Sequence, residues 1–453
     1  MTATTAPAVE PVDEWLPLRR LAPLACQHLL AGVAAPVSSA ILVATTLKLS
    51  AGQTASLLSA TLVLCGVGAL AQSVGVRALR VGARLPFLML PGGAAVAIFL
   101  QIAREYGPAT ASGSVLLAAA FLLCVLPFYG RLIRLFPPLV MSTAVVLIGI
   151  NMIKVTAPMV ASGPALGFAT LAVIALFFLV LRGVWRQLAV LLGLAGGTLV
   201  AVLTGTEPHM AHGGAFALPD PFPYGPPHFD LLASVPLLVF ALASLAEATG
   251  QTVLNSEAVG RPADPGRDVP RIARADALVS LGSGIFGTSL MVTSAENIGI
   301  VQLTHVRSRF VTAAAGVLLI VCGLFTPLTR ALAAIPEPVV GAAGLVVYAV
   351  IAVMGFGMLS RADLAHGSDG IVVALALVVG LLPIVAPEMY AGLPSWARIL
   401  FGSGVAAGAI AAVVLSAVFR LLGPDRAPTA TRPRPRQDGI PAPEAPGTPP
   451  PVR

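Results

Sequence analysis

Two acidic residues lie inside stretches of sequence that are otherwise apolar. Glu247 is within the run Val235–Val253, and Glu296 is within the run Ser294–Thr304, which has apolar stretches on both sides. A carboxylate can accept hydrogen bonds or take up a proton. A charged side chain at the centre of a bilayer costs about 2.5–3.5 kcal/mol on insertion scales. Acidic residues kept at that cost indicate a function, and the pattern favours transport of a polar solute.

The composition of the chain identifies the surroundings of these two residues. The chain has 453 residues, of which 57% are hydrophobic and 10% charged, and its mean hydropathy is +0.91. Soluble domains carry about 25% charged residues. The sequence therefore predicts an integral membrane protein. The excess of 27 Lys and Arg over 20 Asp and Glu is not gathered in one patch, which excludes a nucleic-acid partner.

Apolar runs of about 20 residues cross a bilayer as helices. Fourteen crossings are predicted, several of them short, at residues 20–38, 55–76, 86–103, 114–129, 132–151, 163–181, 186–204, 231–253, 272–286, 294–304, 309–329, 337–358, 370–386 and 397–420.

The basic residues orient these crossings. With the N-terminus in the cytoplasm, 22 of the 27 Lys and Arg residues fall in inside segments and 5 in outside segments. This bias is the one that the positive-inside rule requires. We expect an inner-membrane protein with both termini cytoplasmic, a cytoplasmic N-terminal segment (1–18), an extracellular loop (205–230) and a disordered, Pro-rich cytoplasmic tail (423–453).

The chain shows signs of an internal repeat. Crossing five opens with Phe136-Pro137-Pro138, and crossing twelve opens with Ile335-Pro336-Glu337-Pro338. Seven crossings separate the two, and because seven is odd the halves would have opposite orientation. The sequence therefore predicts an all-α polytopic membrane protein of 14 transmembrane segments, built as a 7+7 inverted repeat. In such transporters the binding site lies near the midplane, on broken helices.

Pro and Gly locate the broken helices in segments 3 and 10, since both residues disfavour helix interiors. The breaks predict short extended segments at Phe87–Leu90 and Leu290–Thr293. Such backbone is tolerated at membrane depth only where protein buries it or it lines a cavity. Half-helices would then begin near Gly92 and Ser294, with free N–H groups and positive dipole ends facing the site.

Four short motifs follow one another along residues 20–420. They are Gln27-His28, Ala246-Glu247-Ala248-Thr249-Gly250, Ala275-Asp276, and Glu296-Asn297-Ile298-Gly299 with Thr304 after four further positions. In this order and spacing they resemble the nucleobase–ascorbate transporter family, also called nucleobase:cation symporter family 2.

The resemblance implies a core domain (19–130 and 231–330) and a gate domain (131–204 and 335–420) that move by an elevator-like alternating-access motion. It also implies a secondary active transporter that imports a nucleobase such as uracil or a purine of the xanthine or urate type. The expected coupling ion is a proton, with sodium as the alternative, and the expected assembly is a homodimer in the lipid bilayer. We expect no cofactor, no metal site and no enzymatic activity.

The same resemblance assigns residues to the site. Glu247 and Glu296 match the carboxylates that hold the base, and the backbone near Ser294 and Ala295 matches its main-chain contacts. The start of the half-helix in segment 3, at Gly93 and Ala94, is also placed at the substrate. Two carboxylates could accept the N–H groups on opposite edges of a planar base. Burial favours the neutral form of a carboxyl group, so we expect one Glu to gain a proton before the substrate binds.

This sequence departs from the family pattern at three positions. Gln251 stands where uracil permeases have His and xanthine permeases have Asp, and Gln does not titrate. The stretch Gly92–Ala95 lacks the aromatic that stacks on the base. His305 ends the motif where Lys, Arg or Gly is usual.

The roles of the supporting polar residues are open to more than one interpretation. Gln251 lies one helical turn from Glu247, so it either binds the base or orients Glu247. Asn297 is favoured as a helix cap over a substrate contact. His28 is favoured as a partner of core backbone over a neighbour of the site. Asp276 either pairs with an arginine (Arg271 or Arg274) or tunes gating.

Three other functions compete with nucleobase symport. A symporter of the same architecture for a small organic or inorganic anion is disfavoured by two carboxylates at its centre. An ion channel would carry rings of charge, whereas Glu247 and Glu296 lie in dissimilar contexts. A membrane enzyme would need a catalytic set, and no P-loop is possible because neither Lys48 nor Lys154 follows Gly.

Overall fold

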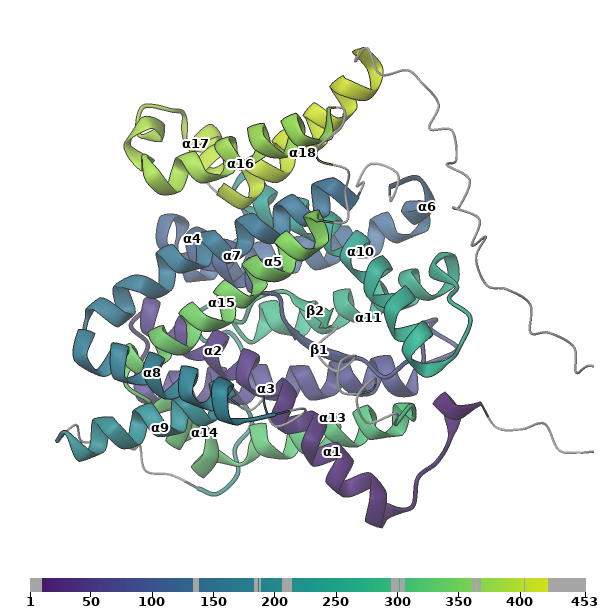
Figure 1. Ribbon diagram of the computed structural model, residues 1–453, viewed down its shortest axis with the longest axis vertical. Helices are drawn as coiled ribbons and strands as arrows, with labels where there is room; N and C mark the ends of the chain where they lie inside the picture. Colours follow the sequence, from purple (N-terminus) through teal and green to yellow (C-terminus); the bar gives the residue numbers. More distant parts are fainter. Residues whose placement is uncertain are drawn as a thin grey trace, which may run out of the picture.

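The computed structural model describes residues 10–132, 138–182, 186, 189–205, 214–294, 301, 306–360, 364, 368–402 and 404–422. Across these residues the chain is mostly helical, with one two-stranded sheet near the centre of the bundle (Figure 1). Ala295, Glu296, Asn297 and the tail 423–453 lie outside the described residues. The second half-helix and His305 therefore stay predictions.

The described part of the first half contains the strand β1 (Leu88–Pro91) and a series of α-helices. These are α1 (Leu18–Gly32), α2 (Ala34–Thr46), α3 (Ala51–Val74), α4 (Gly93–Tyr106), α5 (Pro108–Val125), α6 (Tyr129–Leu132), α7 (Pro138–Ala161), α8 (Pro164–Val180) and α9 (Ala189–Leu203).

The second half contains the strand β2 (Met291–Ser294) and a matching set of described helices. These are α10 (Leu231–Val259), α11 (Pro265–Ile285), α13 (Arg309–Leu324), α14 (Thr326–Ala333), α15 (Glu337–Leu359), α16 (Asp369–Val385), α17 (Ser395–Gly402) and α18 (Gly404–Leu422).

The two strands confirm the extended segments expected from Pro and Gly, each shifted by one residue. They pair antiparallel, with Leu88 opposite Ser294 and Pro91 opposite Met291. Each strand is too short to satisfy its backbone alone, and the pairing supplies hydrogen bonds that lipid cannot. All four residues of β1 are buried, so protein encloses the sheet.

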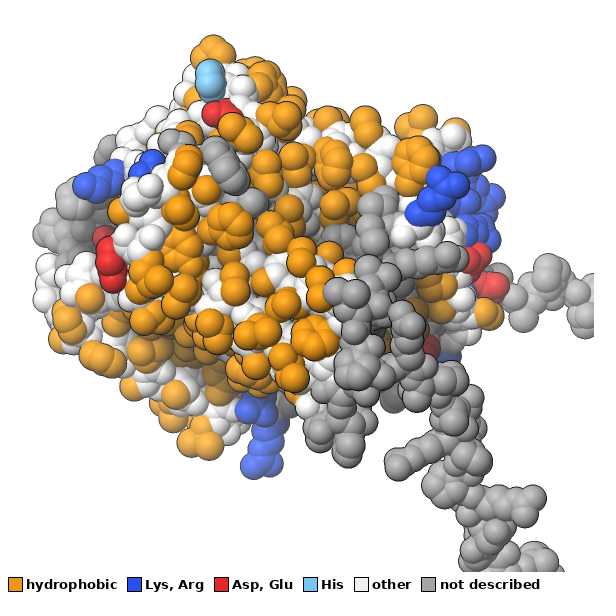
Figure 2. Space-filling model, turned by 90° about the horizontal axis from the view of Figure 1, so that it is seen from above, with side chains coloured by type: hydrophobic (Ala, Val, Ile, Leu, Met, Phe, Trp, Pro, Cys, Tyr) orange, Lys and Arg blue, Asp and Glu red, His pale blue; other side chains and the backbone are white. Residues whose placement is uncertain are grey.

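The helices are long and apolar enough for a multi-pass membrane protein. Four of those described span at least 18 residues with high hydropathy, namely Ala51–Val74, Pro108–Arg131, Leu231–Val259 and Glu337–Leu359, and shorter apolar helices accompany them. The face in Figure 2 is covered by hydrophobic side chains, with Lys and Arg gathered at its edges. Such a surface suits contact with lipid.

Two expected crossings are each two helices. Crossing one breaks between α1 and α2 at Val33, three residues before Pro36, whose ring would clash with the carbonyl one turn back. Crossing eleven breaks at Phe325, directly before the first turn of α14, which contains Pro327.

Other crossings are longer than expected. Helix α7 runs on to Ala161, past the expected end at residue 151, and the Asn151 amide donates to the Leu147 carbonyl within the helix. Helix α11 begins at Pro265 instead of residue 272, because Asp264 caps its first turn.

Glycines allow helices of the bundle to approach closely. Helices α3 and α13 pack along much of their length. A Cβ on Gly66 would overlap the Gly316 carbonyl oxygen, and one on Gly316 would lie 2.8 Å from the Gly66 carbonyl oxygen. Small residues permit such contacts between membrane helices.

Candidate functional site

One face of α10 carries an aromatic ring and three polar side chains. Phe240, Glu247, Gln251 and Asn255 follow one another at intervals of seven, four and four residues. At 3.6 residues per turn these intervals place all four on one stripe of the helix. The stripe therefore faces a single set of neighbours.

Two contacts show that these neighbours are the strands. The end of the Phe240 ring lies 3.1 Å from the place where a Cβ on Gly92 would stand, at the end of β1. Asn255 Nδ2 donates to the Pro86 carbonyl oxygen at 2.9 Å, just before β1. The helical span between these residues is about 22 Å and the extended span about 20 Å, so α10 lies along β1 in antiparallel sense. Glu247 and Gln251 fall between the two contacts and face the sheet.

Glu247 and Gln251 are joined by a hydrogen bond. Gln251 Nε2 donates to Glu247 Oε1 at 2.9 Å, and Gln251 is 8% exposed. The bond confirms that the two residues share a face, and it shows that Gln251 orients the carboxylate. Gln251 Oε1 is buried without a hydrogen-bond partner among the described residues. Burying an acceptor without a hydrogen bond costs free energy, so this oxygen can accept a hydrogen bond from an N–H donor of a ligand.

Strand β2 is held from behind by α11. Asp276 accepts hydrogen bonds from the Thr293 hydroxyl at 2.6 Å and the Thr293 backbone N–H at 3.2 Å. One turn further on, Ser280 Oγ bonds both the N–H and the carbonyl of Met291. Two side chains of one helix thereby fix both ends of the strand.

Gln72 completes this support from α3. Its Nε2 donates to Thr293 Oγ1 at 2.7 Å, to Asp276 Oδ1 at 3.0 Å and to the Ile272 carbonyl at 3.0 Å. Sequence reasoning missed Gln72 and Thr293. The available signal was an uncharged polar side chain within an apolar run, which alone does not identify its partners.

The ion pair, one of the two roles expected for Asp276, is not formed within the described residues. Within the described residues its carboxylate is bound by Gln72 and Thr293, while Arg274 Nη1 donates to the Arg80 carbonyl instead. Asp276 is 5% exposed and faces β2, whereas Arg274 lies at the end of the bundle. The two side chains, two positions apart on α11, therefore point in different directions.

The two buried carboxylates differ in how well they are satisfied. Asp276 has three donors, from Gln72 and Thr293, whereas Glu247 has one, from Gln251, within the described residues. Glu247 is therefore the carboxylate with free capacity for a ligand or a proton.

The start of α4 supplies a positive helix end beside the stripe. Gly93 opens α4 after Gly92, whose N–H donates to the Leu290 carbonyl at 3.1 Å. No side chain in the described part of the chain caps this helix, and Ala94 is buried. The first N–H groups of α4 and its dipole thus lie where the Phe240 ring meets Gly92.

The other predicted site residues are brought together only in part. Ser294 ends β2 opposite Leu88 and is half-buried, so it belongs to the sheet. Glu296, Ala295 and Asn297 follow it outside the described residues. Their distance from Glu247 therefore stays a prediction.

His28 does not have the role favoured by its sequence context. It is 1% exposed on α1, and neither ring nitrogen has a hydrogen-bond partner among the described residues. The expected bond to core backbone is therefore not found within that part of the chain. Its surroundings are apolar, since the nearby Ala25 and Leu88 belong to one hydrophobic cluster.

The described residues contain no group of three His, Cys, Asp or Glu side chains that could hold a metal ion. The chemistry available at the stripe is therefore that of carboxylate, amide and main-chain groups. These groups bind a polar ligand through hydrogen bonds and exchange protons.

Comparison with protein families and curated proteins gives consistent matches over most of the chain. A model described as "Permease family" matches residues 19–389. The uric acid permease PucK of Bacillus subtilis (strain 168) is 31% identical over 90% of this chain and 97% of its own length. The xanthine permease of the same organism is 29% identical over 88% and 93%. The uric acid transporter UacT of Escherichia coli (strain K12) is 29% identical over 90% and 88%.

Solved structures share the fold at lower sequence identity. The transmembrane domain of the cyanobacterial bicarbonate transporter BicA matches with a TM-score of 0.56 at 16% identity, covering 90% of this chain and 100% of that one. The murine anion transporter Slc26a9 in the inward-facing state matches with a TM-score of 0.59 at 9% identity, covering 89% and 68%. These likenesses concern architecture alone.

Proposed function

Because the chain belongs to this permease family, the nucleobase–ascorbate transporters, we propose that it imports a nucleobase of the xanthine, urate or uracil type across the cell membrane. Permeases move their substrates without converting them, so the chain is a transporter and not an enzyme. The three relatives named above are permeases or transporters of uric acid or xanthine, which supports a purine first.

The observation that carries the proposal is the set of acceptors on the α10 stripe. Glu247 offers a carboxylate with one donor, and Gln251 offers a buried amide oxygen without one, within the described residues. Nucleobases present N–H donors along the edges of a flat ring. A carboxylate and a carbonyl one turn apart suit two such donors on one edge.

The remaining contacts of the proposed site come from three elements. Glu296 would accept from the opposite edge, and the N–H groups near Ser294 and Ala295 would donate to ring carbonyls. Gly93 and Ala94 would lie at the ring through the start of α4. Phe240 provides the aromatic surface next to Gly92 that segment 3 itself lacks.

Proton coupling would act through Glu247. Desolvation favours the neutral form of a buried carboxyl, and Gln251 supplies its one donor among the described residues. In this scheme Glu247 and Glu296 share one proton taken from outside, so that one carboxylate stays ionised to accept the base, and release inside frees the proton. Since Gln251 does not titrate, Glu296 is the proposed second acid, and sodium is the alternative coupling ion.

Helix packing supports the 7+7 inverted repeat. Helix α3 packs on α13 and, in the corresponding position of the other half, α11 packs on α5. Likewise α1 packs on α13 where α10 packs on α5, and α8 packs on α9 where α16 packs on α18. Corresponding elements also meet each other, as β1 with β2 and α7 with α15. This pattern is what two halves related by a pseudo-two-fold axis would give.

The proposed domains meet along α2 and α15. The core would comprise residues 19–130 and 231–330, and the gate residues 131–204 and 335–420. Tyr348 of α15 is buried and hydrogen-bonds Ser39 of α2 across this boundary. An elevator motion of the core past the gate would break this contact.

Loop contacts support the proposed orientation. Segments expected inside meet each other, as Asp13 with Arg84 and Ser308 with the Glu14 carbonyl. Segments expected outside meet at the other end, as the Asp220 N–H with Ser56 and the His228 N–H with the Ala109 carbonyl. An error in the number of crossings between them would have mixed the two groups. Cytoplasmic termini and a homodimer are part of the proposal.

The test is counterflow uptake into proteoliposomes of labelled xanthine, with uric acid, uracil, bicarbonate and chloride as competitors. We expect unlabelled xanthine inside to drive transient accumulation of the label, and a nucleobase to compete with it. Competition by bicarbonate or chloride alone would favour the anion symporter. Absence of counterflow for every labelled nucleobase would contradict the proposal.

A further inference from the structure

The segment before α1 is folded onto the inner end of the core elements. Pro11–Asp13 forms a short 3-10 helix, and Val12 is 3% exposed in a cluster with Leu85, Phe87 and Val301. The Trp15 ring meets the Phe310 ring edge-on, with centroids 4.6 Å apart. A segment expected to be a polar cytoplasmic end is therefore packed against the residues that lead into β1.

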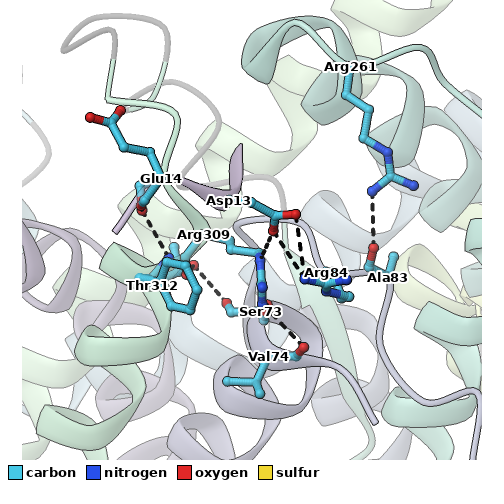
Figure 3. A network of polar contacts seen from close by, with 11 residues as sticks. Asp13, Glu14, Ser73, Val74, Ala83, Arg84, Arg261, Arg309 and Thr312 are labelled. Carbon is cyan, nitrogen blue, oxygen red and sulfur yellow. Dashed lines mark hydrogen bonds and ion pairs between the residues drawn. The ribbon is translucent and has the colours of Figure 1, made fainter. Parts of the chain in front are cut away.

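Asp13 lies between two arginines (Figure 3). Its Oδ1 accepts from Arg309 Nε at 2.5 Å and from Arg84 Nη2 at 3.3 Å. The Arg309 side chain is 6% exposed, and its Nη1 donates to the Ser73 and Val74 carbonyls at 2.6 and 3.2 Å. Arg309 thereby caps the end of α3, and Asp13 balances its buried charge.

Arg84 connects this cluster to the approach of β1. It adopts a φ of 60°, a left-handed conformation that is uncommon outside Gly, and its N–H donates to the Gln72 carbonyl at 3.0 Å. Burial and the neighbouring Arg309 guanidinium lower the pKa of Arg84, while Asp13 raises it. Asp13 therefore offsets repulsion between two arginines at the start of the strand segment.

Gln72 carries the connection into the binding site. Its backbone carbonyl holds Arg84, and its side chain donates to Asp276 and Thr293, which fix β2. A continuous set of hydrogen bonds and ion pairs thus runs from Asp13 at the inner end of the molecule to the strand pair that faces Glu247.

We propose that Asp13 is a positioning residue for the substrate site: the N-terminal segment acts as a strap that fixes Arg84 and, through Gln72, the sheet opposite Glu247. The proposal rests on the proposed function for its substrate, but the contacts that carry it do not. A segment outside the membrane helices would thereby contribute to substrate affinity.

Removing the Asp13 charge has a defined consequence. Arg309 is buried and held by two carbonyls and the Phe310 ring, whose centroid lies 4.4 Å from its guanidinium carbon. Arg84 is more exposed, with 26% of its side chain accessible, so it is the partner free to move away. Without its ion pair to Asp13, the Arg84 side chain no longer anchors its own backbone, whose N–H donates to the Gln72 carbonyl, so the segment leading into β1 would loosen.

The test compares substrate dependence of uptake for wild type, Asp13→Asn, Asp13→Glu and Glu14→Gln, with folded carrier quantified in each preparation. We expect Asp13→Asn to raise KM about 3- to 30-fold, the range for substitutions within coupled networks, and Asp13→Glu to restore most of the affinity. Glu14→Gln is the matched control, because the Glu14 side chain is exposed and only its carbonyl accepts a bond, from Ser308. Its KM should equal that of wild type.

A purely structural role gives a different result. A lower maximal rate with wild-type KM in Asp13→Asn would overturn the proposal. If Asp13→Asn does not fold, Arg84→Gln removes the same contact from its other side, and the same rise in KM is expected; an unchanged KM would overturn it.

A second readout does not depend on the substrate. Met89 of β1 is fully buried, so a cysteine placed there in a background without the four native cysteines should react slowly with a thiol reagent. We expect Asp13→Asn to accelerate this reaction and Glu14→Gln to leave it unchanged. Equal thiol reaction rates in wild type and Asp13→Asn would overturn the strap, whether or not the protein transports a nucleobase. Absence of nucleobase transport would contradict only the proposed function.

Discussion

Thr293 and Asp276 form the best-satisfied polar pair of the sheet. The Thr293 hydroxyl donates to Asp276 at 2.6 Å while it accepts from Gln72 at 2.7 Å, so one hydroxyl serves an acid and an amide at once. All three side chains are buried. In such a network the loss of one member leaves the others unsatisfied.

We expect Thr293→Val to destabilise the carrier by about 1–3 kcal/mol, because the isosteric side chain leaves a buried carboxylate and a buried amide without this partner. Thr293→Ser keeps the hydroxyl and should stay close to wild type. The measurement is the thermal unfolding midpoint of purified carrier. Equal midpoints for Thr293→Val and Thr293→Ser would show that the hydroxyl has no such role.

At this scale the sequence predicted short-range pairs better than long-range ones. The pairing of Gln251 with Glu247 follows from helical spacing and is confirmed. The partners of Asp276 lie on β2 and α3, and Gln72 is 204 positions away from it in the chain. No local pattern contains that contact, so the arginines nearby in sequence were the wrong expectation.

Among the elements, the packing of α3 on α13 depends on glycine. Gly66→Val should cost about 1–3 kcal/mol, because the added carbons meet the Gly316 carbonyl and the Ile320 backbone, neither of which can move cheaply. Gly52→Val is the matched control in the same helix, since no atom lies within 4 Å of its added Cβ. A stability assay in detergent that ranks Gly52→Val equal to or below Gly66→Val would refute this packing argument.

The elements also show what local sequence signals determine. Pro86, Pro91 and Gly92 mark β1 within one residue, because both residue types disfavour helix interiors and here they cluster within seven positions. The break between α1 and α2 was missed, since Pro36 lies within an apolar run long enough for one crossing. The pairing of β1 with β2 is a tertiary contact, so no local sequence signal predicts that the two extended segments form one sheet.

At the scale of the whole molecule, polar contacts hold the proposed core at both its inner and its outer end. The strap of residues 10–16 holds the inner end, and on the outer side Tyr224 donates to the Gly287 carbonyl at 3.0 Å while the Asp220 N–H donates to Ser56 at 2.8 Å. These contacts tie the N-terminal segment and the loop 205–230 to elements of the proposed core. The proposed core and these two segments would therefore move as one body, with Ser39–Tyr348 at the proposed boundary with the gate.

We expect a thiol crosslink between Ser39→Cys and Tyr348→Cys to stop transport, because it fixes the core to the gate. The matched control is a crosslink between Ser56→Cys and Asp220→Cys, which joins the start of α3 to the loop 205–230 without bridging core and gate, and it should leave transport intact. Both pairs are made in a background without the four native cysteines. Full uptake by the crosslinked Ser39–Tyr348 pair would contradict relative motion at this boundary.

The position of Glu247 depends on its own helix, on the neighbouring sheet and on the proposed moving core. Counterflow of labelled xanthine by wild type and Glu247→Gln decides its role. Gln keeps the shape and one acceptor but loses the charge, so we expect affinity to fall about 10- to 100-fold, the loss typical of a hydrogen bond to a charged group. Wild-type affinity and counterflow in Glu247→Gln would show that the transported base is bound elsewhere.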